Sequence, residues 1–295
     1  MKKFSFILCF ILLTLACEDV IEVELPTTEP RLIIEALMRV DINEEFIPVE
    51  VKVTETDNFF GDVPVTSLEN ILIVITLTDS LGIESSGIST LAESEPGTGV
   101  YIPDPNFSTD QRIPTSAVAF DLRYDLIIEH KGRKHIAQTK YIPSAPIIKL
   151  EQGDGTLFGD DETEITIGFH DEAIDNYYIF DYDNNEYLVS EDKFYQGQEF
   201  EFTNSLDREI EPGTTINVSI LGADKTFYEY MSQLLEQSEE SQGPFQTPTA
   251  TVRGNVFDIT DLDNRIVFDN VEQPNVFPLG YFAIVEEQKA SITIQ

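Results

Sequence analysis

Residues 117–142 read AVAFDLRYDLIIEHKGRKHIAQTKYI and contain two segments rich in β-branched and aromatic residues. The first segment, Ala117–Glu129, and the second, Lys134–Ile142, flank the turn His130-Lys131-Gly132-Arg133. A short turn with a glycine between two such segments is typical of an antiparallel β-hairpin. This stretch therefore predicts two paired strands and a mainly β protein.

The same type of pattern continues on the N-terminal side of the hairpin. Leu32–Leu37 is an apolar strand, Pro48–Thr54 alternates valines with polar residues, and Asn70–Thr78 is a buried strand followed by a turn. Gly97–Tyr101 is a further turn that leads into a strand. Short strands separated by turns, without a helical period, predict an immunoglobulin-like antiparallel β-sandwich over residues 31–145.

The second half, residues 146–295, is predicted to be another β-rich domain, which begins after the joint Pro143-Ser144-Ala145-Pro146. Its last strands are expected at Gly280–Glu286 and Ser291–Ile294. One helix is predicted near 224–240, with Asp224 as its N-cap. Its apolar stripe should pack on the sheet of this domain, and the residues of the stripe are Phe227, Tyr230, Met231, Leu234 and Leu235.

The N-terminus carries an export signal. Two lysines, the apolar run Phe4–Leu15 and the small residue Ala16 precede Cys17, so residues 1–16 are predicted to be a lipoprotein signal peptide and Cys17 the lipidated residue. Thr14 departs from the branched apolar residue usual three places before such a cysteine, and an ordinary secretory signal cut after Ala16 is the alternative. Residues 17–30 would form an acidic tether.

Composition limits the possible partners and chemistry. The chain has 54 acidic and 18 basic residues, for a net charge of −36, which disfavours nucleic acid as a partner. Its two cysteines are Cys9, inside the signal, and Cys17. The mature body therefore has no cysteine for a disulfide, and its stability must come from an apolar core.

Several short motifs occur in the order and at the spacing of one protein family. They are the cysteine and acids at 17–19, RLIIEALM at 31–38, Gly99-Val100-Tyr101, Tyr124-Asp125-Leu126-Ile127 with Gly132 and Ala137-Gln138-Thr139, Asp224-Lys225 before Tyr228-Glu229-Tyr230, Gly254-Asn255, and Gly280-Tyr281-Phe282. In these residues the mature chain resembles the Bacteroidota lipoproteins grouped as domain of unknown function 4249.

The resemblance implies outer-membrane lipoproteins encoded beside TonB-dependent receptors, and hence an accessory role at an uptake or surface complex. Glu18 and Asp19, directly after Cys17, resemble the acidic signal that sends such lipoproteins to the outer face of the outer membrane. The resemblance supplies no catalytic residues.

The residues themselves offer little evidence for catalysis. There is no Gly-x-Ser-x-Gly motif, and His130, His135 and His170 form no His-Glu-x-x-His pair, so no catalytic residues are assigned. We interpret His130 and His135 as ordinary surface histidines, with a zinc site on adjoining strands as the alternative. The many acids leave a hydrolase based on two carboxylates open.

One acidic loop has the ligand types and spacing of a calcium site. Asp181, Asp183 and Asn185 alternate, and Asp192 follows eleven residues after the first of them. Calcium takes hard oxygen ligands, and alternate loop residues present them to one centre. A β-hairpin turn with Asp183-Asn184-Asn185 at its tip is the simpler interpretation, and no other cofactor is expected.

A group of aromatic residues lies around this loop: Tyr177, Tyr178, Phe180, Tyr182, Tyr187 and Tyr195. Exposed aromatic rings can stack on sugars, but strand alternation places about half of such rings in a core. The absence of tryptophan argues mildly against a glycan-binding surface.

Taken together, the sequence predicts a non-enzymatic, surface-exposed outer-membrane lipoprotein that is anchored by lipid. The expected role is that of an accessory to a TonB-dependent receptor, in substrate capture or complex assembly. The alternatives are a stand-alone glycan- or peptide-binding lipoprotein and a carboxylate-dependent hydrolase.

Overall fold

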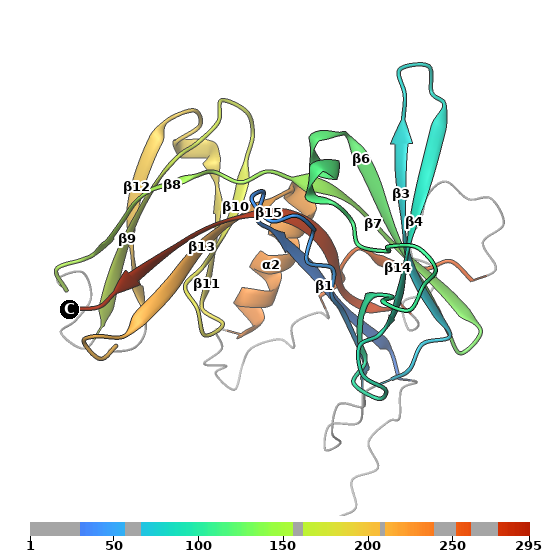
Figure 1. The fold of residues 1–295 in the computed structure, drawn as a ribbon. Coiled ribbons are helices and arrows are strands. Elements are labelled where there is room, and N and C mark those ends of the chain that lie inside the picture. Colours follow the sequence, from blue (N-terminus) through green and yellow to red (C-terminus); the bar gives the residue numbers. More distant parts are fainter. Residues whose placement is uncertain (1–29, 57–65, 156–161, 207–209, 239–251, 261–276) are drawn as a thin grey trace, which may run out of the picture.

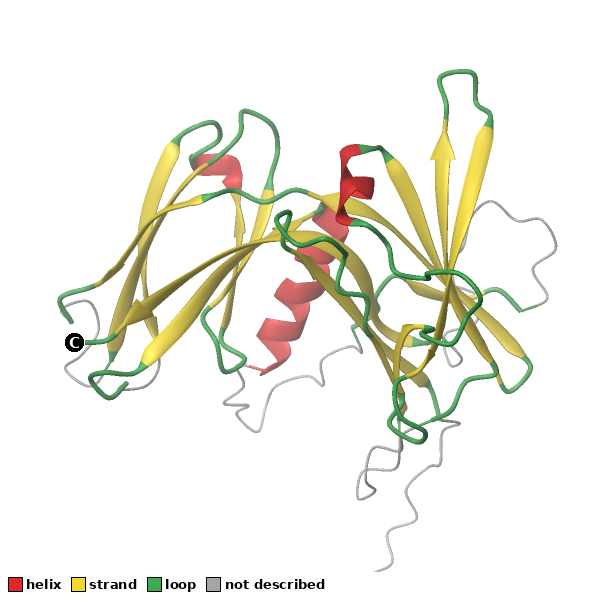
Figure 2. Ribbon diagram, in the orientation of Figure 1, coloured by secondary structure: helices red, strands yellow, loops and turns green. Residues whose placement is uncertain are grey.

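The computed structural model describes residues 30–56, 66–155, 162–206, 210–238, 252–260 and 277–295. These contain the helix α2 (Lys225–Ser238) and the 3₁₀ helices η1 (Thr115–Ala119) and η2 (Asp192–Phe194). The strands are β1 (Leu32–Val40), β2 (Val51–Glu55), β3 (Asn70–Thr78), β4 (Glu84–Glu93), β5 (Val100–Pro103), β6 (Leu122–His130), β7 (Arg133–Ile142), β8 (Ile147–Gln152), β9 (Thr163–His170), β10 (Tyr177–Asp181), β11 (Tyr187–Glu191), β12 (Glu199–Leu206), β13 (Thr215–Ala223), β14 (Val256–Asp258) and β15 (Leu279–Thr293). The predicted mainly β fold with one α-helix is confirmed for this part of the chain (Figure 2).

The hairpin at the centre of the sequence forms as predicted. β6 and β7 pair antiparallel from Arg123–Lys140 to His130–Arg133, and Lys131 and Gly132 both adopt positive φ in the turn. Only its beginning differs, because Ala117–Ala119 belong to η1 instead of the strand. The hairpin is thus determined by its own turn and by its alternating residues.

Seven strands of the N-terminal part, β1 to β7, and the C-terminal strand β15 form a closed, barrel-like sheet (Figure 1). Their order is β15-β1-β2-β5-β4-β3-β6-β7, and β7 returns to β15 through the pairs Ile284–Tyr141 and Val285–Ile142. β15 runs parallel to both of its neighbours in this sheet, β1 and β7. The large buried side chains inside the barrel include Ile34, Met38, Ile73, Tyr124, Leu126, Ile128 and Phe282.

The predicted immunoglobulin-like sandwich over residues 31–145 is therefore wrong in its architecture. Alternation along a strand shows that one face is buried, but it does not show which strand pairs at each edge. The deciding strand, β15, comes from the far end of the chain and pairs in parallel, which local hairpin signals do not predict.

The two-layer arrangement occurs instead in the second half of the chain. The three-stranded sheet β12-β9-β8 faces the strands β11-β10-β13 and the C-terminal part of β15 (Figure 1). The core between the layers is aromatic: the Phe169 ring makes edge or tilted contacts with Tyr178, Phe180 and Tyr195. Four of the six aromatic residues noted in the sequence, Tyr178, Phe180, Tyr182 and Tyr195, are buried in this core.

β15 belongs to both parts of the molecule. Its first half pairs with β1 as far as Glu286, and its second half, Glu287–Thr293, pairs antiparallel with β13. The segments predicted as separate strands at 280–286 and 291–294 are thus one continuous strand. Strand pairing alone does not define folding domains, so the division between residues 145 and 146 stays a prediction.

The start of β15 is fixed by a close backbone approach and by one asparagine side chain. Gly280 has φ +94°, and a Cβ there would collide with the carbonyl oxygen of Ile34 on β1. The Asn255 side chain forms the two hydrogen bonds to Phe282 that the backbone of a neighbouring strand would form. Its Oδ1 accepts the Phe282 N–H at 2.9 Å, and its Nδ2 donates to the Phe282 carbonyl at 2.8 Å. Its Nδ2 also donates to the carbonyl of Gln138 on β7 at 3.2 Å. These contacts close the barrel.

We predict that Gly280→Ala destabilises the protein by about 3–5 kcal/mol, because the side chain adds both strain at positive φ and a clash in a packed interior. Urea unfolding followed by circular dichroism would measure the change. Gly87→Ala is the matched control, since Gly87 also lies in a strand but has open space around its Cα. Equal stability of the two variants would contradict this account of the β1–β15 contact.

Candidate functional site beneath helix α2

Helix α2 begins with the predicted N-cap. The Asp224 Oδ1 atom accepts the Phe227 N–H at 2.7 Å, which satisfies one of the free donors of the first turn. The first part of the apolar stripe, Phe227, Tyr230 and Met231, then packs on the outer face of β10, β13 and β15. Phe227 is buried there against apolar residues of these strands. The prediction of this helix and of its cap is confirmed.

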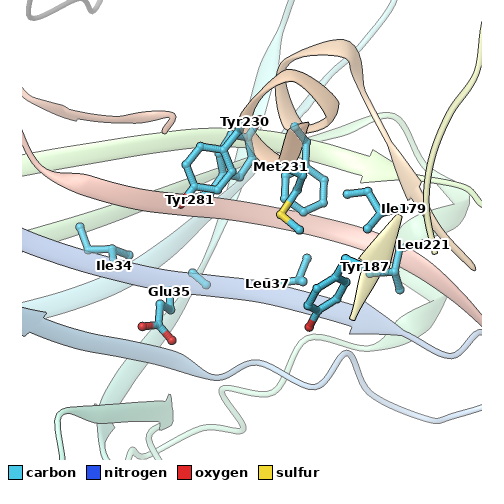
Figure 3. A pocket seen from close by; sticks show the side chains of 11 residues that line it. Ile34, Glu35, Leu37, Ile179, Tyr187, Leu221, Tyr230, Met231 and Tyr281 are labelled. Atoms are coloured by element: carbon cyan, nitrogen blue, oxygen red, sulfur yellow. The ribbon is translucent and has the colours of Figure 1, made fainter. Parts of the chain in front are cut away.

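α2 does not cover the whole apolar face. A groove remains between the side chains of α2 and the outer face of β1, and we call it the groove beneath α2. The groove has a volume of about 230 Å³. It is lined by Ile34, Glu35, Ala36, Leu37, Ile179, Tyr187, Leu221, Phe227, Tyr230, Met231 and Tyr281 (Figure 3). Figure 3 shows the Tyr230 and Tyr281 rings together on one side, with Leu37 and Tyr187 toward the other. An apolar hollow with a few polar groups is the common form of a binding site.

The pattern of β1 explains why a groove forms here. Ile34, Ala36 and Met38 point into the barrel, so Glu35 and Leu37 lie on the outer face of the strand. Glu35 is in register with Tyr281, and Leu37 with Ala283. Leu37 stays 38% exposed, although apolar neighbours surround it. The groove therefore presents an apolar surface that the described residues leave partly open.

Three tyrosines give the groove its polar character. Tyr230 and Tyr281 have ring centroids 4.9 Å apart, and Tyr187 stands on β11. Burial raises the pKa of Tyr230, and the Glu35 carboxylate raises it further. Burial likewise raises the pKa of Tyr187, with Asp181 adding to the effect. At neutral pH these hydroxyls are therefore protonated and can donate hydrogen bonds.

One end of the groove is bordered by an ion pair that joins the two halves of the molecule. Arg39 of β1 donates from its guanidinium to Asp181 of β10 at 2.5 Å and lies 3.4 Å from Glu287 of β15. Glu287 also accepts a hydrogen bond from the Ser219 hydroxyl at 2.6 Å. These two carboxylates therefore hold Arg39 at the border of the groove.

Two other hollows are lined differently. One, of about 430 Å³, lies among mostly polar residues at the ends of β8 and β15. The other, of about 320 Å³, lies between η1 and the end of β7, where Lys140 donates to Asp121 at 2.6 Å. Neither combines an apolar lining with several tyrosines, so we take the groove beneath α2 as the candidate site.

The structure separates the residues of the predicted calcium site. Asp181, Asp183 and Asn185 lie at the β10–β11 turn, where Asp183 and Asn185 have positive φ. Asp192 lies at the other end of β11, where it accepts the Asn176 N–H at 2.8 Å. A five-residue strand spans roughly 17 Å, so Asp192 does not join the other three. Asp181, Asp183 and Asn185, which remain close together, are accounted for by the β-hairpin turn between β10 and β11.

The first two of those residues also have protein partners. Asp181 pairs with Arg39 and accepts the Asp183 N–H at 3.0 Å. Asp183 accepts hydrogen bonds from the backbone and side chain of Asn217 at 2.7 and 3.1 Å. Within the described residues there is also no group of three or more His, Cys, Asp or Glu side chains arranged to hold a metal.

His130 and His135 are buried, so their interpretation as surface residues is wrong. His130 Nε2 lies 2.9 Å from the Glu55 carboxylate, which also accepts from Lys131 at 2.7 Å. Burial alone would raise the pKa of Glu55, but the hydrogen bonds from Lys131 and His130 outweigh it and lower the pKa. His135 lies 3.8 Å from Asp258, and burial lowers its pKa. The first contact joins β2 to β6, and the second joins β7 to β14.

Two buried carboxylates approach each other at one end of the sandwich. Asp171 accepts the Tyr178 hydroxyl at 2.6 Å and the Gly197 N–H at 2.8 Å. Burial raises the pKa of Asp192, and the charge of Asp171 adds to the shift. Neither residue lines any of the three hollows described above, and their hydrogen bonds brace turns. The burial of Asp171 is thus explained by its structural hydrogen bonds.

The predicted lipidation residue Cys17 and the predicted export signal Glu18 and Asp19 lie outside the described residues. Among the residues that the structure does describe, no helix is both long and apolar enough to cross a bilayer.

A comparison with family models matches residues 18–267 to the domain of unknown function DUF4249. The chain belongs to this family. No curated protein matches the chain. The family match covers most of the chain, including β1, α2 and β14.

The structure gives physical roles to the motifs that carry the resemblance to DUF4249. Gln138 donates to Asp125 at 2.7 Å, and its carbonyl accepts from Asn255, so three separate motifs form one network behind the barrel closure. Tyr230 and Tyr281, from two further motifs, meet in the groove. The motifs therefore mark the closure of the barrel and one wall of the candidate site.

The groove is not predictable as a site from the sequence. The sequence predicts that Tyr230 and Met231 belong to the packed stripe of the helix, and that Glu35 and Leu37 belong to a strand. One signal was available: β1 carries apolar residues on both faces, since Ile33 and Leu37 alternate with the barrel residues. A strand with two apolar faces is usually covered on both sides. The sequence does not show which element covers the outer face of β1.

We predict that Asp224→Ala lowers the stability by about 1 kcal/mol through loss of the N-cap. Asp224→Ser is the control, because serine keeps an oxygen that can accept the Phe227 N–H. Urea unfolding at neutral pH would compare the two variants. An equal loss in both would show that the cap hydrogen bond is not the cause.

We also predict a pH-dependent gain in stability from Asp192→Asn. Because the folded state raises the pKa of Asp192, ionising this carboxyl above the ordinary pKa of aspartate costs stability. Asparagine keeps an oxygen for the Asn176 N–H and carries no charge. The stability of the variant relative to the wild type should therefore rise as the pH increases from about 3.5 to 7. A difference that stays constant with pH, measured by urea unfolding, would contradict the shift.

Proposed function

We propose that this protein is a surface-exposed outer-membrane lipoprotein, anchored through Cys17, that serves as a non-enzymatic accessory of a TonB-dependent receptor. The observation that carries the proposal is the groove beneath α2, an open apolar surface with three tyrosines and a single carboxylate among its lining residues. Such a surface is suited to binding rather than to general acid–base chemistry, which uses two positioned groups.

The sequence supports the anchor. The apolar run before Cys17 is about the length of a signal peptide and shorter than the roughly 20 residues of a spanning helix. Residues 17–30 then precede β1 and, fully extended, would reach roughly 45–50 Å. A body on such a tether can lie against a neighbouring membrane protein. Membership of the DUF4249 family supports the receptor link through the resemblance described above.

A stand-alone peptide- or glycan-binding lipoprotein is the second candidate, and the same groove supports its peptide-binding form. The tyrosines at its wall are residue types enriched in binding surfaces. The receptor accessory and the stand-alone lipoprotein differ in whether the protein binds a receptor in the membrane.

We predict that Cys17→Ser moves the protein from the membrane fraction to the soluble fraction, since one acyl-modified residue is the only proposed anchor. Cys9→Ser is the control, because Cys9 lies within the predicted signal and should leave fractionation unchanged. Membrane retention of the Cys17→Ser protein would refute the anchor.

The receptor link needs a separate measurement. The wild-type protein, extracted from its native membrane in mild detergent, should co-purify with a β-barrel receptor that mass spectrometry identifies. Purification of the lipoprotein alone under these conditions would favour the stand-alone candidate.

A further inference from the structure

The size of the groove limits what can occupy it. Its volume of about 230 Å³ is below the roughly 300–1,000 Å³ of pockets for drug-sized ligands. It exceeds the roughly 150 Å³ of an engineered cavity that binds benzene. The groove can thus hold one aromatic or large aliphatic group, but it is too small for an oligosaccharide. A partner's single anchor side chain has this size.

The charges around the groove favour a particular charge on the partner residues that flank this anchor side chain. The Glu35 side chain is 60% exposed at the groove, and its described cationic neighbour is Lys52, 3.3 Å away and itself half exposed. Arg39 is held by Asp181 and Glu287. A cation next to the anchor side chain could therefore pair with the Glu35 carboxylate, whose exposed ion pair with Lys52 is weak.

The tyrosine rings favour the same chemistry. The faces of aromatic rings attract cations, and Tyr230, which feels the Glu35 charge, stands beside Tyr281. An acidic segment would instead meet Glu35 and the overall charge of −36. Charge complementarity thus favours a basic partner over an acidic or neutral one.

We propose that the groove beneath α2 docks a short segment of a protein partner in which one aromatic or large apolar side chain is flanked by Lys or Arg. The anchor fills the space between Leu37, Met231 and Tyr281, and the flanking cation pairs with Glu35. This inference rests on the proposed accessory function and specifies the recognition chemistry of the partner.

The direct test uses the purified protein without its signal, and fluorescein-labelled peptides built around the core KWK, with KAK and EWE as controls. Fluorescence anisotropy should show that KWK binds at least about 30-fold more tightly than KAK, because the anchor carries most of the energy. Equal binding of KWK and KAK would overturn the proposal, since it would show only attraction to an acidic protein. Binding of EWE as tight as KWK would overturn the charge part.

Variants of the protein locate the site. Glu35→Gln should weaken KWK binding roughly 2–5-fold, as expected for an exposed ion pair, while Lys52→Gln should leave it equal or tighter. Glu50→Gln removes the same charge from an exposed position outside the groove and should have a smaller effect than Glu35→Gln. Leu37→Arg, at a half-exposed position, should abolish binding while its urea unfolding stays close to that of the wild type. Unchanged binding by Leu37→Arg would overturn the site.

Two further measurements exclude other occupants. Free tryptamine combines a ring with a cation, and if it bound as tightly as KWK the groove would be a small-molecule site and the docking proposal would fall. A dimer seen by light scattering and dissolved by Leu37→Arg would assign the groove to a second copy of this chain, which also overturns the proposal.

The proposed function can fail independently. Receptor co-purification with both the wild type and Leu37→Arg would keep the accessory function and reject this docking site. Tight KWK binding at the groove without any co-purifying receptor would reject the receptor link alone.

Discussion

The fold depends on the place where β15 enters the barrel between β1 and β7. The backbone of β1 approaches Gly280 so closely that no side chain fits there, and Asn255 supplies the hydrogen bonds that a neighbouring strand would otherwise make to Phe282. A buried backbone amide without a partner is costly, so this asparagine is needed as much as the glycine. Without this closure the barrel would have two open edges, and its apolar interior would be exposed at a seam.

The same strand determines where a binding surface can form. β15 leaves the barrel after Glu286, whose carboxylate accepts the Tyr141 hydroxyl at 2.9 Å, and then pairs with β13 in the sandwich. Its outer face therefore joins the outer faces of β1 and β10 into one apolar surface across both halves. α2 covers the part over β10 and β13 and leaves the part over β1 as the groove. The Arg39–Asp181 pair connects the two halves at its border.

The polar residues that the sequence offered as sites have mostly structural roles. His130 and Glu55 link strands inside the barrel region, and Asp192 supports a turn of the sandwich. Because the chain is so acidic, many carboxylates are available to form structural hydrogen bonds and ion pairs. Their number is therefore no evidence for a catalytic or metal site. The groove is formed instead by apolar and tyrosine side chains and by Glu35, and none of these belongs to a catalytic or metal-binding motif. The proposed docking role follows from their shape and from the charge of their surroundings.

The local structure of this protein can be predicted from the sequence. The sequence predicts the β6–β7 hairpin from its glycine turn, α2 from Asp224 and its apolar stripe, the mainly β class, and membership of the DUF4249 family from motif order. Each of these depends on residues near one another in the chain, or on spacing that can be read directly. The prediction of Cys17 as the lipid anchor is of the same kind.

Three features depend on contacts between distant parts of the chain: the barrel, the division of the aromatic residues between core and groove, and the candidate site. The parallel pairs of β15 join residues almost 250 positions apart, such as Ile34 and Gly280, and strand alternation does not specify such a partner. Likewise, Glu35 and Tyr230 come together only because α2 lies across the surface that β15 creates. The physical reason is that periodicity records which face of a strand is buried, whereas a groove depends on which distant element covers that face and how far it reaches.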